Sequence, residues 1–203
     1  MNPPWTLKGE GFIFIYNLSA TEQSELWDSE TPTSGITVMM LVHYTESPIG
    51  PYDELLLIPG QIEVEGKKGY SISHIHVSTD ISTENGIKHW GIPKETSGFS
   101  SKRKEQVHHS EITNSAGELS TIEAYSLGIK IPVFTHILPY SLLQANGNQM
   151  CTLRPTARGI TKIAKLKRFE SNQAGFNKLV GKTPLFGFHA TSFLMEFPEG
   201  KWV

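Results

Sequence analysis

The sequence is poor in the features that mark several large classes of protein. It has one cysteine, Cys151, among 203 residues, so no internal disulfide can form. It has no run of about 18 apolar residues, the length that a transmembrane helix needs. Lys and Arg total 18 against 20 Asp and Glu, which gives a net charge of −2 and no basic footprint for nucleic acid. We therefore expect no membrane partner and no nucleic-acid partner.

The first residues also lack a targeting pattern. Met1–Trp5 does not show the charged and then apolar character of a secretory signal. The glycosylation sequon at Asn17–Ser19 is therefore expected to be incidental. Together with the lone cysteine, this favours a reducing, cytoplasmic location, in which Cys151 is a buried and inert thiol.

The residues that are present predict a chain rich in short strands. Eighteen glycines and 12 prolines are spread along the sequence, and 38% of the residues are hydrophobic. We expect one domain over 1–203, because a chain of this length supports one core. The expected strands are 11–16, 35–44, 55–58, 70–78, 107–112, 120–131, 150–154, 160–169 and 192–197.

Helices are expected to be few and short. The sequence predicts a helix over 80–89, capped by Asp80 or Ser82, and one helical turn near 22–27. The apolar strand 35–44 is expected to be buried on both faces, and 97–104 is expected to be a polar surface loop. The fold class is thus mainly antiparallel β, packed as a closed barrel or as two layers, with a few short helices.

A stiff turn presents a lysine in the segment Trp90–Lys94, with sequence WGIPK. Glycine and proline restrict the backbone between two apolar anchors, so Lys94 has little freedom. If Lys94 points inward, burial disfavours its charged form, and a neutral amine attacks ketones to form a Schiff base. On local chemistry alone, a solvated surface lysine is the commoner outcome.

Two carboxylates stand at the start of an apolar strand in Pro51–Glu54, with sequence PYDE. Strand alternation places Asp53 and Glu54 on opposite faces, so one of them can face inward and exchange protons with a substrate. The alternative is that both cap the strand in water.

A third pattern is the pair His74 and His76, which share one face of a strand and can chelate a metal. Asp80 follows at a distance that suits a facial triad, loosely as in a cupin. The spacing is imperfect, so we expect two partly exposed histidines and no metal. The basic residues of 154–168 are expected to form a solvated strand face.

Taken in order, PYDE at 51–54 and WGIPK at 90–94 resemble the acetoacetate decarboxylase-like superfamily, over about residues 48–95. The resemblance implies a β-rich, cone-like closed barrel with a deep cavity, assembled as a homo-oligomer and needing no cofactor or metal. It implies that Lys94 is the Schiff-base nucleophile and that Glu54 is an acid/base or positioning group. Tyr52, Trp90 and Glu95 are the expected substrate-binding residues.

The sequence departs from the decarboxylase pattern at two points. Glu95 stands where the decarboxylase has a second lysine, and no arginine precedes Arg103, although the decarboxylase uses an N-terminal one. A carboxylate beside Lys94 would favour its charged form, so we expect Glu95 to face away, toward a basic group or solvent.

These observations predict a lyase acting on a small ketone or keto acid through Lys94. Decarboxylation is the first expectation, and aldol or dehydration chemistry is the second. A non-catalytic cavity protein, in which Glu95 pairs with a charged Lys94, is the alternative. A cupin-like metal enzyme built on His74, His76 and Asp80 is the third possibility.

Overall fold

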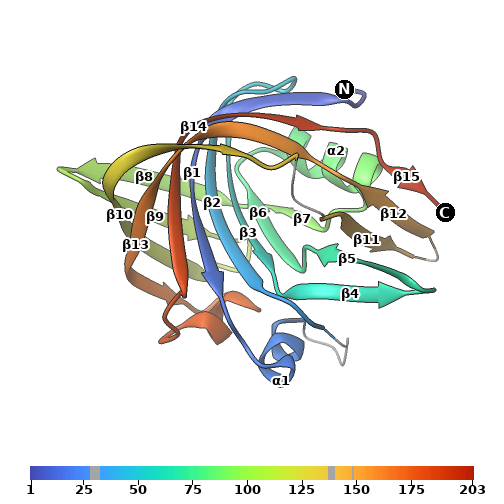
Figure 1. The fold of residues 1–203 in the computed structure, drawn as a ribbon, viewed down its shortest axis with the longest axis horizontal. Coiled ribbons are helices and arrows are strands. Elements are labelled where there is room, and N and C mark those ends of the chain that lie inside the picture. The colour runs from blue at the N-terminus through green and yellow to red at the C-terminus, as the bar shows by residue number, and fades with distance from the viewer. Residues whose placement is uncertain (28–32, 137–139, 148) are drawn as a thin grey trace.

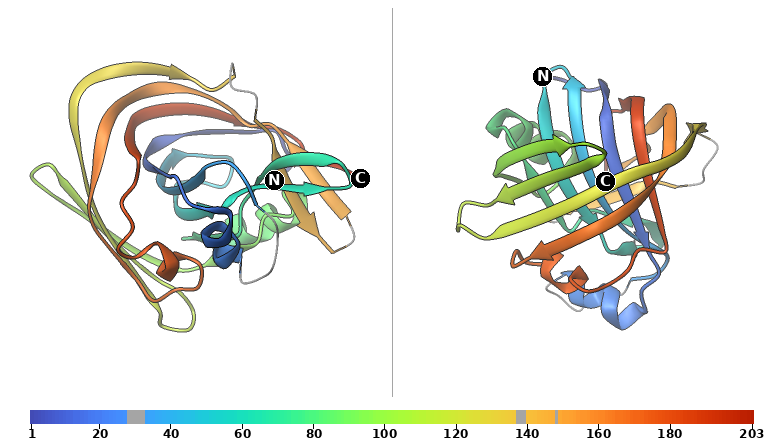
Figure 2. Two further views of the ribbon diagram at one scale, coloured as in Figure 1. Left: turned by 60° about the horizontal axis from the view of Figure 1, so that its bottom comes forward. Right: turned by 90° about the vertical axis from the view of Figure 1, so that its left-hand side faces the viewer.

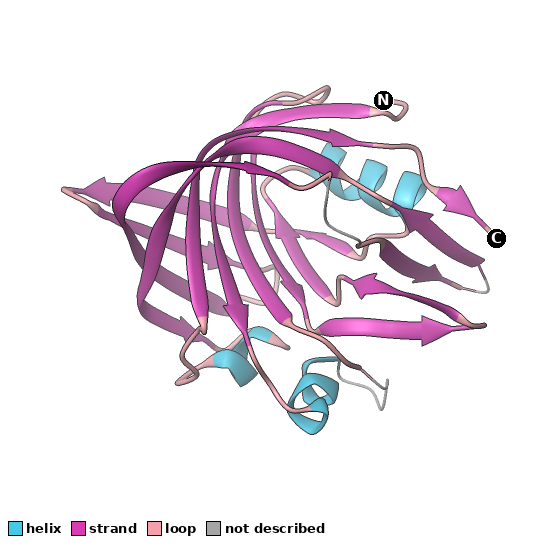
Figure 3. Ribbon diagram, in the orientation of Figure 1, coloured by secondary structure: helices cyan, strands magenta, loops and turns pink. Residues whose placement is uncertain are grey.

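The computed structural model describes residues 1–27, 33–136, 140–147 and 149–203. Strands dominate it, and short helices lie at its periphery (Figure 3). The strands are β1 (Trp5–Tyr16), β2 (Thr37–Glu46), β3 (Tyr52–Ile58), β4 (Gly60–Val64), β5 (Lys67–Ser71), β6 (His74–Val77), β7 (Lys94–Thr96), β8 (Gly98–Lys104), β9 (Val107–Thr113), β10 (Leu119–Phe134), β11 (Leu142–Asn146), β12 (Gln149–Leu153), β13 (Thr156–Ser171), β14 (Phe186–Phe197) and β15 (Lys201–Trp202). The helices are α1 (Ala20–Ser24), α2 (Asp80–Trp90) and the 3-10 turns η1 (Glu25–Trp27) and η2 (Phe176–Leu179).

The larger sheet curls into a nearly closed barrel (Figures 1 and 2). Its strands follow the order β7-β6-β3-β2-β1-β14-β13-β10-β9-β8, and only β6 and β7 in it run parallel. Its two edge strands, β7 and β8, are consecutive in the chain and separated by Ser97. The predicted fold class, a mainly antiparallel barrel with few helices, is therefore confirmed.

The smaller sheet, of order β15-β12-β11-β5-β4, and helix α2 pack beside the barrel (Figure 1). Strand alternation sends neighbouring side chains of the barrel into two different cores. The core inside the barrel contains Phe14, Leu55 and Phe176. The other core lies between the barrel, α2 and the small sheet, and it contains Leu56 and Trp90. The candidate site lies in this second core.

Helix α2 fixes the geometry of the residues that follow it. Its N-cap is Thr79, whose side chain accepts a hydrogen bond from the Ser82 amide, rather than the expected Asp80 or Ser82. It ends at Gly91, which has a φ of 66°, a left-handed conformation that glycine adopts without strain. The chain then turns directly into β7, which begins at Lys94.

Two other expectations were wrong in detail. The segment expected to be a surface loop at 97–104 forms β8, because its backbone pairs with β9 although its side chains stay polar and exposed. The single strand expected at 70–78 is divided into β5 and β6, which belong to different sheets. Strand β2 is buried on both faces, as expected, because Met39 lies in the barrel core whereas Val42 and Tyr44 lie in the other core; His43 near its end is exposed. No described helix is long and apolar enough to cross a membrane.

Candidate active site

The lysine of WGIPK and the glutamate of PYDE meet in the core beside α2. Lys94 Nζ lies 2.9 Å from Glu54 Oε2, and each of the two side chains is 6% exposed. Lys94 is the first residue of the edge strand β7, and Glu54 comes from β3, two strands away across β6. A charged pair this deeply buried is costly unless further hydrogen bonds hold it, and such bonds are present.

Hydroxyl groups surround the pair on both sides. Lys94 Nζ donates to Ser82 Oγ of α2 at 3.0 Å, and the Tyr44 hydroxyl donates to Glu54 Oε1 at 3.1 Å. The Tyr52 ring lies 5.3 Å from Nζ. Burial, with a further contribution from Glu54, raises the pKa of Tyr44 and that of Tyr52 well above the ordinary value. Both phenols therefore remain protonated donors at neutral pH.

A glycine on α2 makes room for the lysine. A Cβ added to Gly86 would lie 2.5 Å from Lys94 Cδ and 2.9 Å from Cε. The lysine stem thus crosses the helix where it has no side chain. Ser82, Gly86 and Trp90 follow one another at intervals of four residues and form the buried face of α2. That spacing is a sequence signal for Ser82 and Gly86 that the motif comparison missed.

An apolar cavity of about 150 Å³ opens beside the amine. Its charged lining residues are Lys94 and Glu54, and two predicted substrate-binding residues, Tyr52 and Trp90, also line it. The others are Trp5, Leu7, Met40, Tyr44, Leu56, Ile58, Ile72, Ile75, Ile92, Tyr140, Leu142, Pro155, Met195 and Phe197. A small ketone would therefore meet one amine and one carboxylate against apolar walls.

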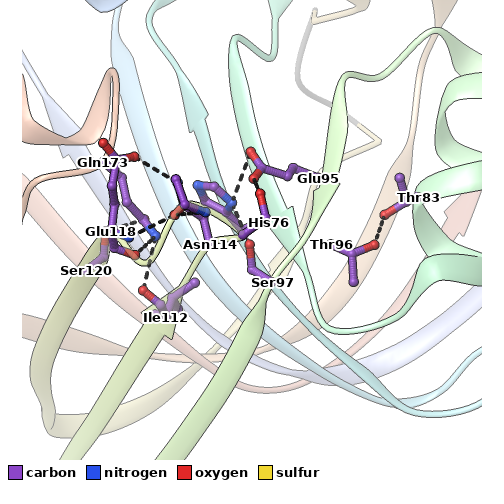
Figure 4. Close-up of polar contacts among 12 residues, drawn as sticks. His76, Thr83, Glu95, Thr96, Ser97, Ile112, Asn114, Glu118, Ser120 and Gln173 are labelled. Carbon is purple, nitrogen blue, oxygen red and sulfur yellow. Dashed lines mark hydrogen bonds and ion pairs between the residues drawn. The ribbon is translucent and has the colours of Figure 1, made fainter.

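Glu95, the third predicted substrate-binding residue, is not among the described residues that line this cavity. Its carboxylate lies across β7, where it accepts a hydrogen bond from Ser115 Oγ at 3.2 Å and lies 3.9 Å from His76 Nδ1 (Figure 4). Its side chain is 46% exposed. The structure thus places Glu95 facing away from Lys94 and toward a basic group, as we expected.

The histidines of the metal hypothesis make other contacts. His76 Nδ1 lies 2.9 Å from Ser97 Oγ, and burial lowers the pKa of His76 (Figure 4). His74 Nδ1 lies 2.9 Å from Ser73 Oγ, and Asp80 is an exposed residue at the start of α2. Among the described residues, no three His, Cys, Asp or Glu side chains are grouped so as to hold a metal ion.

The remaining candidates have ordinary surroundings. Lys167 forms an ion pair with Glu123 at 3.1 Å, and Arg168 forms one with Glu170 at 2.7 Å. Cys151 is fully buried, and burial raises the pKa of its thiol to about 11, which leaves it unreactive at neutral pH.

Comparison with known proteins finds no match for the sequence but several for the structure. No family model matches this sequence, and no curated protein matches it. Solved structures do match over nearly the whole chain. Acetoacetate decarboxylase from Legionella pneumophila superposes with a TM-score of 0.70 at 15% identity, over 99% of this chain and 87% of its own. The chain has the acetoacetate decarboxylase-like fold.

Two further structures with this fold extend the likeness. An acetoacetate decarboxylase-like enzyme from Sphingomonas wittichii RW1 superposes with a TM-score of 0.71 at 9% identity, over 98% of this chain and 92% of its own. The enduracididine biosynthesis enzyme MppR, in complex with pyruvate, superposes with a TM-score of 0.67 at 14% identity, over 100% and 91% of the two chains. The acetoacetate decarboxylase-like fold is thus shared with enzymes, including one solved with a keto acid bound.

Proposed function

We propose that the chain is a Schiff-base-forming lyase that acts on a small ketone or keto acid through Lys94. The observation that carries this proposal is the Lys94–Glu54 pair buried at the wall of an apolar cavity. An amine attacks a carbonyl only in its neutral form, and burial disfavours the charged form of an amine. The fold shared with MppR and with acetoacetate decarboxylases supports the same chemistry.

Glu54 is placed to move the protons of this reaction. It accepts a hydrogen bond from Lys94 Nζ, so it can take the proton that the ammonium must lose before attack. The amine adds to the substrate carbonyl, and loss of water leaves a protonated imine. Tyr44 donates to the other oxygen of Glu54 and so holds the carboxylate toward the lysine.

The protonated imine then accepts the electron pair of an adjacent bond. If that bond leads to a carboxylate, CO₂ leaves and an enamine remains. A proton added to the enamine carbon and hydrolysis of the imine release the product and free Lys94. If Glu54 instead removes an adjacent C–H proton, an enamine also forms and can attack an aldehyde; loss of water from the adduct and hydrolysis of the imine then release the condensation product and free Lys94. Decarboxylation is our first proposal, and the aldol type is the second.

The acid group of a keto acid has no cationic partner in the cavity other than Lys94 itself. A neighbouring groove shares Met40, Tyr44, Tyr140 and Met195 with the cavity. Arg158 lies on the strand beside this groove, but its neighbours Ala157 and Gly159 face the groove, so alternation along β13 directs the exposed Arg158 side chain to the other face of the sheet.

Borohydride trapping tests the proposal. Wild-type protein incubated with acetoacetate or pyruvate and reduced should gain one covalent adduct, seen by intact-protein mass spectrometry. Lys94→Met should lose the adduct, and Lys88→Met, which changes an exposed lysine of α2, should keep it. Absence of an adduct in wild type, or its persistence in Lys94→Met, would contradict the proposal.

The two reaction types need separate measurements. CO₂ release from acetoacetate indicates decarboxylation, whereas exchange of the pyruvate methyl protons in D₂O without CO₂ release indicates the aldol type.

The non-catalytic alternative loses its expected basis, because Glu95 does not pair with Lys94. It now depends on Glu54 keeping Lys94 permanently charged. A protein that binds ketones without forming the adduct would favour this alternative.

A further inference from the structure

A second cavity lies on the opposite face of β3, the strand that carries Glu54. It has a volume of about 250 Å³, larger than the cavity beside Lys94. Its lining residues belong to β1, β2, β3 and β14 on one side and to the hairpin of β8 and β9 on the other. The proposed reaction uses none of its lining residues. Asp53 and Glu54 are neighbours in sequence, and alternation along β3 places Asp53 here and Glu54 in the other cavity.

A buried histidine without hydrogen bonds lines this second cavity. His189 is 5% exposed, and neither ring nitrogen has a hydrogen-bond partner among the described residues. Phe12 stacks on one face of the His189 ring, with centroids 4.2 Å apart and an interplanar angle of 10°. A ligand would therefore contact the polar edge of the ring. Buried polar atoms are nearly always hydrogen-bonded in native proteins. The edge of His189 is therefore suited to a ligand.

A second histidine, His108, lies beside His189 and also lines the cavity. The His108 ring lies 5.2 Å from that of His189. Burial, followed by His189 and Arg103, lowers the pKa of His108, so this ring is neutral at pH 7. A neutral imidazole offers one N–H donor and one acceptor. The floor of the cavity thus favours a ligand with both donors and acceptors.

Opposite charges face each other across the cavity. Lys102 and Arg103 stand on the β8 wall, and Glu10 stands on the β1 wall, with Oε2 3.8 Å from His189 Nε2. The His189 ring lowers the pKa of Glu10, which is therefore ionised. His43 and Asp53 also line the cavity, but they pair with each other at 2.7 Å. A simple anion would face Glu10, and a simple cation would face Lys102 and Arg103.

We propose that this second cavity binds a small amino or hydroxy carboxylate. Its carboxylate lies toward Arg103 and Lys102, and its amino or hydroxyl group donates to Glu10, above the stacked Phe12 and His189 rings. This proposal rests on geometry independent of Lys94, and it holds whether or not the chain forms Schiff bases.

Four probes that differ by one group each test the proposal on the full chain. L-Alanine carries a carboxylate and an ammonium, L-lactate a carboxylate and a hydroxyl, propionate only the carboxylate, and ethylammonium only the ammonium. Isothermal titration should show alanine or lactate binding at least about tenfold more tightly than propionate and ethylammonium, the effect of one further charge-assisted hydrogen bond.

Variants then assign the site. Arg103→Gln should weaken the binding of both alanine and propionate, because the carboxylate of each probe loses its cationic partner. Glu10→Gln should weaken the binding of alanine, whose ammonium loses its charged partner. The same change should strengthen the binding of propionate, because it removes the repulsion between two carboxylates. Glu63→Gln, an exposed change on β4, is the matched control and should alter neither affinity.

Two readouts separate this site from the Lys94 cavity. The imidazole resonances of His189, assigned by their loss in His189→Gln, should shift when alanine or lactate is added. Lys94→Met should leave this binding intact, and Arg103→Gln should leave borohydride trapping intact. Equal affinity for all four probes, no binding at millimolar concentration, or loss of binding in Lys94→Met would overturn the proposal.

Discussion

Asp53 and Glu54 are adjacent carboxylates that meet very different surroundings. Glu54 pairs with Lys94 at 2.9 Å, where both side chains are 6% exposed. Asp53 pairs with His43 at 2.7 Å, where the side chains are 28% and 51% exposed. Both pairs are short, but water screens only the second. The difference shows that burial, and not contact distance, distinguishes the surroundings of the two carboxylates.

Removing each carboxylate should produce the largest difference between the two pairs. Glu54→Ala leaves a buried lysine without its partner, and we expect the free energy of unfolding to fall by about 3 kcal/mol or more. Asp53→Ala removes a solvent-screened pair, and we expect a loss of about 1 kcal/mol or less. Urea denaturation of both variants measures the difference. Equal losses would mean that the Lys94 pair is not sheltered from water.

Crowding the lysine stem should have the next largest effect. Gly86→Ala places a methyl group 2.5 Å from Lys94 Cδ, so the lysine must shift. We expect the rate of borohydride trapping to fall by about tenfold or more, because small displacements of a nucleophile are costly. Gly98→Ala is the matched control, since its methyl group would meet Thr113 O at 3.7 Å, an ordinary contact. A Gly86→Ala protein that traps at the wild-type rate would show that the lysine reaches the cavity by another path.

The smallest effect on trapping is expected for the carboxylate on the far side of β7. Glu95→Gln should leave the rate of borohydride trapping and its pH midpoint nearly unchanged, because Glu95 faces His76 and not Lys94. The same change should lower the pKa of His76 further, since the Glu95 charge opposes the effect of burial on that ring. Histidine NMR measures that pKa. A shift of the trapping midpoint by a full pH unit would make Glu95 a direct partner of Lys94.

The sequence predicts the Lys94–Glu54 pair better than its surroundings. PYDE and WGIPK are local patterns, so Glu54 and Lys94 could be named without a structure, and alternation along the strand correctly separated Glu54 from Asp53. Tyr44 could not be named, because its position depends on which strands pair across the barrel. The loop expected at 97–104 failed for the same reason: backbone pairing with β9 outweighs the polar side chains of β8.

The turn before β3 has a consequence for how this protein can change. Strand side chains alternate with a period of two, so a one-residue slip sends every side chain to the other face. A single insertion or deletion between β2 and β3 that shifted the register would turn Asp53 and Glu54 to the opposite faces of the strand. A slip in one direction would bring Asp53 to the position facing Lys94, and a slip in the other would bring Leu55 there and place Glu54 in the second cavity. The length of this short turn, from Ser47 to Pro51, thus determines which carboxylate faces which cavity.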